Sequence, residues 1–489
     1  MKKRNLLILF LTMLVTAQTC NTDLSPTGSI NFNPTNCIVD VGDENGQCST
    51  SITWETTSVK EPFVEVKLSS GETFDCRASN QKVTRETGDW IGTDGKTFEL
   101  YPASNCGAAS PFTLLASETV YARKGLSCSL DGEAVQVEES IIGMGAKELT
   151  ENYPLEEIIN LLADANVKSV VMPLHWYKVE PDAPRREVHG YNWDYDVLTK
   201  NAEKFKVTVT MGRPPKWAST CYQMPYVPSD CVDSCDGIQE YCDHLIKPNR
   251  ARYMLYPPDL DKWAVFVEEA ARHYGSQGTG QIKAWEIWNE PNGEDFFVGT
   301  QDYYISILNR AYAAIKLGDP EAYVYGGQLA VHPYNDNDER KDFFRKIIRE
   351  GKYDGIAFHV YYDDLSSGKE AIKWVRAELD DFGRQDARIS ISETNALVAV
   401  VNCEDYTSID QAKLLRDTYA CYATGGADEI YWFTATDLHG DNCVLDSNGD
   451  PVNAVGVLET DVGPYDTVIN PTPKESYYSL KEIGDHLKP

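Results

Sequence analysis

Short stretches of alternating hydrophobic and polar residues occupy much of the first 135 positions of the chain. Alternation with a period of two is typical of β-strands that bury one face. It is found at Ser51–Glu55, Phe63–Leu68, Thr97–Tyr101 and Glu118–Ala122. Turn-forming pairs such as Ser70-Gly71 and Asp94-Gly95 separate these stretches. This part of the chain is therefore predicted to be a small antiparallel β-structure.

These strands predict an accessory domain over residues 20–136. Short antiparallel strands with frequent turns favour a β-sandwich, and the pattern resembles immunoglobulin-like modules. We expect Trp54 in its core. Cys37 with Cys48, and Cys76 with Cys106, are expected to form disulfides within it.

From residue 137 onward the pattern changes to strand, then helix, repeated. The segment Leu155–Leu162, for example, has the hydrophobic spacing of an amphipathic helix and precedes an apolar strand. Eight strands are predicted, at Ser140–Met144, Val167–Met172, Phe205–Met211, Ile282–Trp288, Ala322–Gly327, Gly355–Tyr361, Arg388–Glu393 and Glu429–Phe433. This alternation predicts an α/β fold, a parallel (β/α)8 TIM barrel over residues 137–489. An open doubly wound sheet is the alternative, but no glycine-rich dinucleotide loop follows the first strand.

The N-terminus has the pattern of an export signal, predicted over residues 1–19. Lys2, Lys3 and Arg4 precede an apolar run from Leu6 to Val15. That run is too short to span a bilayer, and no later stretch is long and apolar enough, so no membrane span is expected. Cleavage after Ala17 is favoured, and a lipid anchor on Cys20 is the alternative. Both place the protein outside the cytoplasm, either secreted or at the cell surface, in an extracellular or periplasmic compartment.

Cysteine content and charge limit the partners. Thirteen cysteines in an exported chain favour disulfides. The group Cys221, Cys231, Cys235 and Cys242 lies in a long insertion over residues 213–256 and lacks the paired Cys-x-x-Cys spacing of structural zinc.

The formal net charge of −30 disfavours nucleic acid and anionic membranes as partners. We expect a monomer with no metal and no cofactor.

Two glutamates lie where two of the predicted barrel strands end. In such barrels the catalytic groups come from the C-terminal ends of the strands. Strand four ends in Asn289-Glu290, and strand seven ends at Glu393. The two carboxylates are therefore expected to face each other across the barrel mouth.

Opposed carboxylates are the groups that glycoside hydrolysis requires, one as a proton donor and one ionised. Asn289 is suited to hold a sugar hydroxyl, and Trp432 on strand eight to stack on a sugar ring. His359 and Tyr361 on strand six are expected to donate hydrogen bonds to Glu393. The sequence thus predicts a carbohydrate-active site.

The sequence around these residues resembles clan A of the glycoside hydrolases, the four-over-seven barrels. That resemblance is carried by Trp288–Pro291 together with Ser392–Asn395. Three segments, Trp285–Asn292, His359–Tyr361 and Leu308–Lys316, are similar to family 39 and its cellulase-like relatives. The resemblance implies a retaining mechanism without a cofactor, acting on the β-glycosidic bonds of a poly- or oligosaccharide. Glu290 would be the acid/base and Glu393 the nucleophile, with carboxyl groups about 5 Å apart.

The sequence departs from the clan pattern on strand two. Many clan members carry an arginine there that supports the nucleophile, but Val170–Trp176 contains none. We expect His175 or Arg213 to take over part of this support of Glu393. We also expect His175, Trp176 and Arg213 to contact the substrate. Two alternatives remain open, a non-catalytic carbohydrate-binding barrel and a transglycosylase of the same fold.

Overall fold

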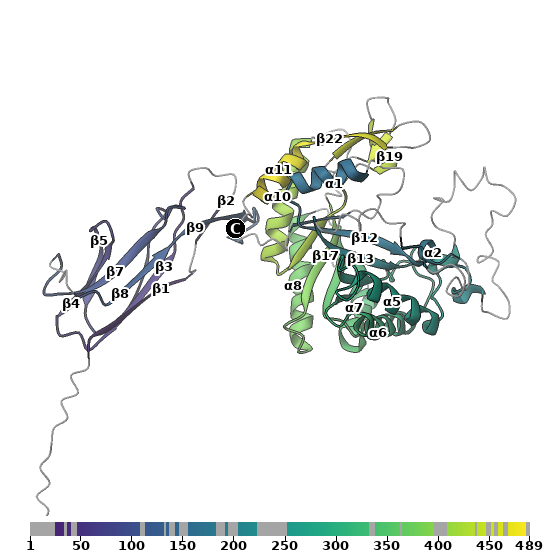
Figure 1. Ribbon diagram of the computed structural model, residues 1–489. Helices are drawn as coiled ribbons and strands as arrows, with labels where there is room; N and C mark the ends of the chain where they lie inside the picture. The colour runs from purple at the N-terminus through teal and green to yellow at the C-terminus, as the bar shows by residue number, and fades with distance from the viewer. Residues whose placement is uncertain are drawn as a thin grey trace, which may run out of the picture. The chain divides into compact units, whose positions relative to one another are not determined.

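The computed structural model describes most of the chain and divides it into two compact units (Figure 1). Residues up to 37 and 45–123 form one unit, and residues 38–44 and 124–489 form the other. The division thus falls at residue 123, whereas the sequence places a boundary at 136. The described residues are 25–33, 37–40, 46–107, 113–131, 134–135, 142–145, 155–181, 191–193, 204–222, 252–331, 338–361, 364–395, 408–435, 438–445, 451–453, 458–462 and 468–485.

Several predictions from the sequence lie outside these residues. They concern the signal peptide over residues 1–19, the alternative lipid anchor on Cys20, and most of the 213–256 insertion. Cys231, Cys235 and Cys242 lie in that part of the insertion, whereas Cys221 is described and is disulfide-bonded.

The first unit is built from two antiparallel sheets. One has the order β1-β3-β6, with β1 at Thr27–Asn33, β3 at Ser51–Thr57 and β6 at Lys82–Glu86. The other has the order β5-β4-β7-β8, with β4 at Phe63–Leu68, β5 at Thr73–Ala78, β7 at Lys96–Ala103 and β8 at Ala116–Val120. Phe32 and Phe98 pack between the two sheets, with ring centroids 5.3 Å apart. The alternating pattern therefore predicted β3, β4, β7 and β8, and it missed β1, β5 and β6.

The core and the cross-links of this unit agree with the sequence. Trp54 is fully buried. The predicted disulfides Cys37–Cys48 and Cys76–Cys106 are both present. The immunoglobulin-like character of the unit stays a prediction.

The second unit is a closed barrel of eight parallel strands in sequence order, as predicted. Its strands are β11 Ile142–Gly145, β12 Ser169–His175, β13 Lys206–Gly212, β14 Ile282–Ile287, β15 Tyr323–Val331, β16 Gly355–Val360, β17 Arg388–Thr394 and β18 Glu429–Trp432. The strands are almost fully buried, because helices cover the outside of the barrel (Figure 1). These helices include α1 Leu155–Asp164, α2 Trp176–Val179, α5 Leu260–Tyr274, α6 Gln301–Gly318, α7 Asp338–Glu350, α8 Leu365–Asp381 and α10 Ser408–Thr424.

Shorter elements complete the second unit. A small sheet has the order β10-β9-β2, with β2 at Cys37–Asp40, β9 at Ala122–Ser127 and β10 at Ala134–Val135. Cys128, directly after β9, forms a disulfide with Cys421 of α10 that the sequence did not predict. The C-terminal elements are the pair β19 Leu438–Leu445 and β20 Pro451–Asn453, the pair β21 Leu458–Val462 and β22 Val468–Pro473, and α11 Glu475–Asp485. Two 3-10 turns, η3 Thr220–Tyr222 and η4 Arg252–Leu255, lie within the 213–256 insertion.

Among the described residues, none of the helices combines the length and the apolar composition needed to cross a bilayer.

Candidate active site

Glu290 lies three residues beyond β14, where the chain turns sharply. Trp288 and Glu290 both have a positive φ, 71° and 43°, which residues other than glycine rarely adopt. Two bonds hold this turn in place: the Trp288 indole donates to the Phe296 carbonyl at 3.0 Å, and the Glu290 N–H donates to the Gln328 carbonyl at 2.9 Å. Such backbone strain persists where the surrounding structure fixes it, and it often marks functional sites.

Glu393 lies near the end of β17 and is 8% exposed. The Tyr361 hydroxyl donates a hydrogen bond to its Oε2 at 2.7 Å. His359 Nδ1 lies 3.3 Å from the same oxygen. The predicted hydrogen bond from Tyr361 to Glu393 is therefore confirmed, and donation from His359 to Glu393 stays a prediction.

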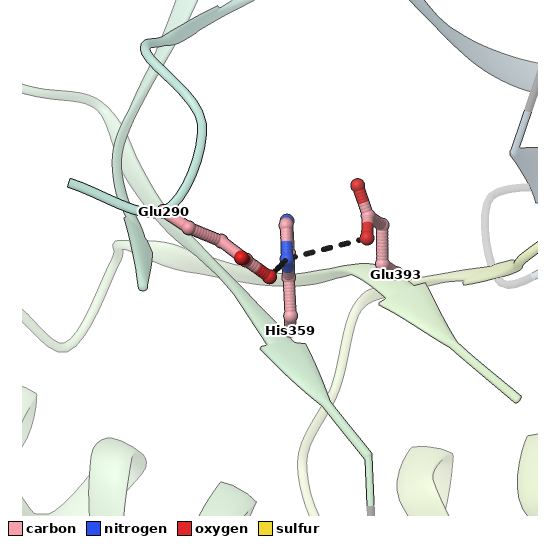
Figure 2. A group of neighbouring side chains, drawn as sticks. All are labelled: Glu290, His359 and Glu393. Atoms are coloured by element: carbon pink, nitrogen blue, oxygen red, sulfur yellow. Dashed lines mark hydrogen bonds and ion pairs between the residues drawn. The ribbon is translucent and has the colours of Figure 1, made fainter. Parts of the chain in front are cut away.

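His359 lies between the two glutamates (Figure 2). Its ring is fully buried, and Nδ1 is 2.7 Å from Oε1 of Glu290. The ring nitrogen and one oxygen from each carboxylate all lie within 4.8 Å of one another. Glu290 and Glu393 are 103 residues apart in the sequence, yet one oxygen of each lies within 4.8 Å of the other, which is compatible with the separation of about 5 Å found in retaining glycosidases.

Among the described residues, Glu290, His359 and Glu393 form a group of side chains that could bind a metal ion. One imidazole and two carboxylates could hold a divalent cation by ligand type alone. The distance of 2.7 Å between Nδ1 and Oε1 is that of a hydrogen bond, which accounts for their contact without a metal.

His175 and Arg213 lie at the ends of the neighbouring strands β12 and β13. The His175 ring stacks on Tyr177 with centroids 5.6 Å apart, and the Tyr177 N–H donates to the Arg213 carbonyl at 3.2 Å. Burial, and then the cations Arg213 and Lys178, hold the pKa of His175 well below its ordinary value, so this imidazole is neutral. Support of Glu393 by His175 or Arg213 stays a prediction.

Two predicted substrate-binding tryptophans are buried, and for them the prediction is wrong. Trp176 is fully buried, stacks on Phe266 at 4.9 Å and donates its indole N–H to Glu180 at 3.0 Å. Trp432 is 1% exposed and belongs to the hydrophobic core. Neither ring has a face available to a sugar.

The alternation of side chains along β18 explains the position of Trp432. Its neighbour Tyr431 points into the barrel, where its hydroxyl is 2.6 Å from that of Ser169. Successive side chains of a strand point to opposite faces, so Trp432 points outward into the layer between strands and helices.

Asn289 is partly exposed beside Glu290, and its contact with a sugar hydroxyl stays a prediction. Sequence reasoning missed Gln328, which is fully buried and whose Oε1 lies 3.1 Å from His359 Nε2. A lone glutamine after two glycines gives no signal for such a role, because only the strand pairing shows where it points.

Comparison with known proteins supports this description. Residues 253–377 match the family model described as glycosyl hydrolases family 39. This region contains Glu290 and His359 and ends before Glu393. The chain is 37% identical over 114 residues to a β-xylosidase of Caldicellulosiruptor saccharolyticus, and the alignment spans 22% of the length of each protein.

A solved structure of a family 39 enzyme is similar in fold to this chain. A family 39 β-xylosidase from Caulobacter crescentus matches with a TM-score of 0.50 and 15% identity, covering 73% of this chain and 72% of that one. A family 39 glycoside hydrolase from the gut symbiont Bacteroides cellulosilyticus WH2 matches with a TM-score of 0.45 and 15% identity. That second match covers 93% of this chain and 82% of the other.

Proposed function

Because residues 253–377 match the model of glycosyl hydrolases family 39, we propose that the chain is a retaining glycoside hydrolase that cleaves β-glycosidic bonds of a poly- or oligosaccharide. The observation that carries this proposal is the meeting of Glu290 and Glu393 within 4.8 Å. An inverting enzyme needs a wider separation, about 6.5–9.5 Å, to place a water molecule between the sugar and its base.

In the first step, the bond between the anomeric carbon and the leaving oxygen breaks. Glu290 gives its proton to the leaving oxygen, and an oxygen of Glu393 forms an ester bond with the anomeric carbon. Tyr361 stays hydrogen-bonded to Glu393 before attack, which orients the carboxylate. The product of this step is a glycosyl-enzyme with Glu290 ionised.

In the second step, water replaces the enzyme at the anomeric carbon. Glu290, now a carboxylate, accepts a proton from the water as its oxygen attacks. The ester bond to Glu393 breaks, and the sugar leaves with its original anomeric configuration. The same residue therefore acts first as acid and then as base.

The substrate proposal rests on the matched relative, whose name is β-xylosidase. We propose β-xylosides as the first substrates to test, followed by aryl glycosides of glucose, mannose and galactose. Endo and exo action are distinguished by the product lengths released from a polysaccharide.

The catalytic roles are tested with two variants and an added nucleophile. Glu393→Ala should abolish turnover while sugar binding remains, and azide should restore cleavage by forming an α-glycosyl azide. Glu290→Ala with azide should instead form the β-glycosyl azide, because the glycosyl-enzyme still forms. Normal turnover by Glu393→Ala would show that the assignment is wrong, and a chain that binds sugars but hydrolyses none would be a binding protein.

We also propose that the protein works outside the cytoplasm, as the cysteines suggest. Three disulfides lie among the described residues, and such bonds persist in oxidising compartments. Cell fractionation of the native host tests the location, and labelling with a fatty acid tests the lipid anchor on Cys20. Enzyme found only in the cytoplasm with free thiols would contradict the proposal.

A further inference from the structure

Gln328 owes its position to an irregularity in β15. The pairing of β15 with β16 passes from Gly327 opposite Ala357 to Leu329 opposite Phe358, so β15 has one extra residue, Gln328, at this register shift. Its φ is 54°, in the left-handed region. A β-bulge of this kind redirects a side chain, and bulges are frequent beside active sites. Here the bulge places an amide side chain inside the barrel mouth.

A second irregularity lies on the other side of β16. The pairing of β16 with β17 passes from Phe358 opposite Ile391 to His359 opposite Glu393, which leaves Ser392 unpaired. The two extra residues meet, because Gln328 Nε2 donates to the Ser392 hydroxyl at 2.8 Å. Both residues are fully buried. The two bulges thus form one hydrogen-bonded unit that passes His359.

This unit contacts the catalytic groups at two points. Gln328 Oε1 lies 3.1 Å from His359 Nε2, and the Gln328 carbonyl accepts the N–H of Glu290 at 2.9 Å. Gln328 therefore fixes the backbone of Glu290 directly and its carboxylate through His359.

The contacts decide where the protons lie. Since the amide nitrogen of Gln328 donates to Ser392, its oxygen faces His359 and accepts a hydrogen from Nε2. Nδ1 of a neutral His359 is then an acceptor that faces Glu290 Oε1 at 2.7 Å. A hydrogen bond between Nδ1 and Oε1 needs one proton. That proton is bonded either to the Glu290 carboxyl, beside a neutral imidazole, or to Nδ1, beside a Glu290 carboxylate.

We propose that Gln328 is a positioning residue that fixes the tautomer of His359, so that His359 and Glu290 share the proton delivered to the leaving oxygen. The inference rests on the proposed function. When the glycosidic bond breaks, this proton moves from the Glu290–His359 pair to the leaving oxygen. It is regained from water in the second step, so the pair ends with the proton count it had at the start.

Substrates with different leaving groups test the proposal. A carboxylate in Gln328→Glu would hold His359 protonated and keep the proton from Glu290, and Gln328→Met would remove the acceptor. Both variants should lower kcat/KM about tenfold or more for alkyl glycosides, which need acid assistance. The kcat/KM of both variants for 2,4-dinitrophenyl glycosides should stay within about twofold of the wild-type value, because that leaving group departs without a proton. An equal loss for both substrates would indicate a general structural defect and overturn the proposal.

Two further variants complete the kinetic test. Ser392→Ala removes the partner of the amide and should show the same selective loss, to a smaller extent. Gln385→Met is the matched control, because Gln385 is a surface glutamine whose amide donates only to a helix carbonyl, that of Asp380. It should behave as the wild type with every substrate.

A direct measurement needs no folded variant at this position. Nitrogen NMR of histidine-labelled wild-type protein, with His359 assigned by comparison with His359→Gln, should show Nε2 carrying a proton. A bare Nε2 would overturn the proposal even in an active enzyme. Failure of the proposed function is a separate outcome, since it would appear as absent turnover of 2,4-dinitrophenyl glycosides by the wild type.

Discussion

The Tyr361 hydroxyl lies 2.7 Å from Oε2 of Glu393 and joins the end of strand six to the proposed nucleophile on strand seven. A hydrogen bond to a charged group contributes about 1.5–3 kcal/mol. Tyr361→Phe should therefore lower kcat/KM by about 10- to 100-fold while the protein stays folded. Steady-state kinetics with an aryl β-glycoside measure the loss. A Tyr361→Phe variant with unchanged kcat/KM would show that this hydroxyl does not assist Glu393.

The disulfide between Cys128 and Cys421 should contribute strongly to the stability of the barrel unit. It closes a loop with a sequence separation of 293, and long loops lose the most chain entropy when cross-linked. Replacing both cysteines by alanine should lower the free energy of unfolding by about 2–5 kcal/mol, as denaturant titration would measure.

The control for that experiment is the disulfide Cys37–Cys48, which has a sequence separation of only 11. Its removal should lower the free energy of unfolding by less, and the denaturant concentration at which the barrel unit unfolds should not change. Equal effects of the two removals would contradict the loop-length argument.

His175 should make the protein less stable in acid. Its pKa is held well below 6.5 in the folded state by burial, then by Arg213 and Lys178. The unfolded chain therefore binds a proton below pH 6.5 that the folded chain does not bind. The contribution of His175 to the free energy of unfolding is therefore complete above that pH. It is lost as the pH falls toward the lowered pKa of the folded state, by at most about 1.4 kcal/mol per pH unit.

Denaturant unfolding of the wild type and of His175→Gln between pH 7.5 and pH 5 tests this prediction. The wild type should lose more stability than the variant over this range, because other titrating groups act equally in both. Parallel pH curves would mean that His175 titrates normally in the folded protein.

Metal removal should leave activity unchanged. The contact of 2.7 Å between His359 and Glu290 is accounted for by one hydrogen bond, and the retaining mechanism needs no metal. Dialysis against EDTA, followed by assay with and without added Zn²⁺, Ca²⁺ or Mn²⁺, checks this. Loss of activity that one of these ions restores would show that Glu290, His359 and Glu393 hold a metal.

The sequence predicted the eight barrel strands because each one is an apolar run of the length of a β-strand, followed by a segment whose hydrophobic residues have helical spacing. It also placed Glu290, His359, Tyr361 and Glu393 at strand ends, and the structure brings these four together. Strand order follows from the same pattern, since parallel strands joined by helices close in sequence order.

Side-chain direction could not be predicted in the same way. Trp432 and Trp176 are aromatic residues near strand ends, which favours a sugar platform, yet both point into the core. A shift by one residue moves a side chain to the other face of a strand, and the apolar run itself does not show which face each residue takes.

The sequence by itself determined the barrel, the strand ends and the pair of carboxylates, because these depend on local periodicity and on the general geometry of parallel strands. Only the tertiary structure decided which side chains reach those carboxylates. Gln328 and Ser392 enter the site through two register shifts beside β16, and a register shift depends on the neighbouring strands. The physical reason is that pairing between strands, which joins residues far apart in the chain, sets the direction of each side chain at the barrel mouth.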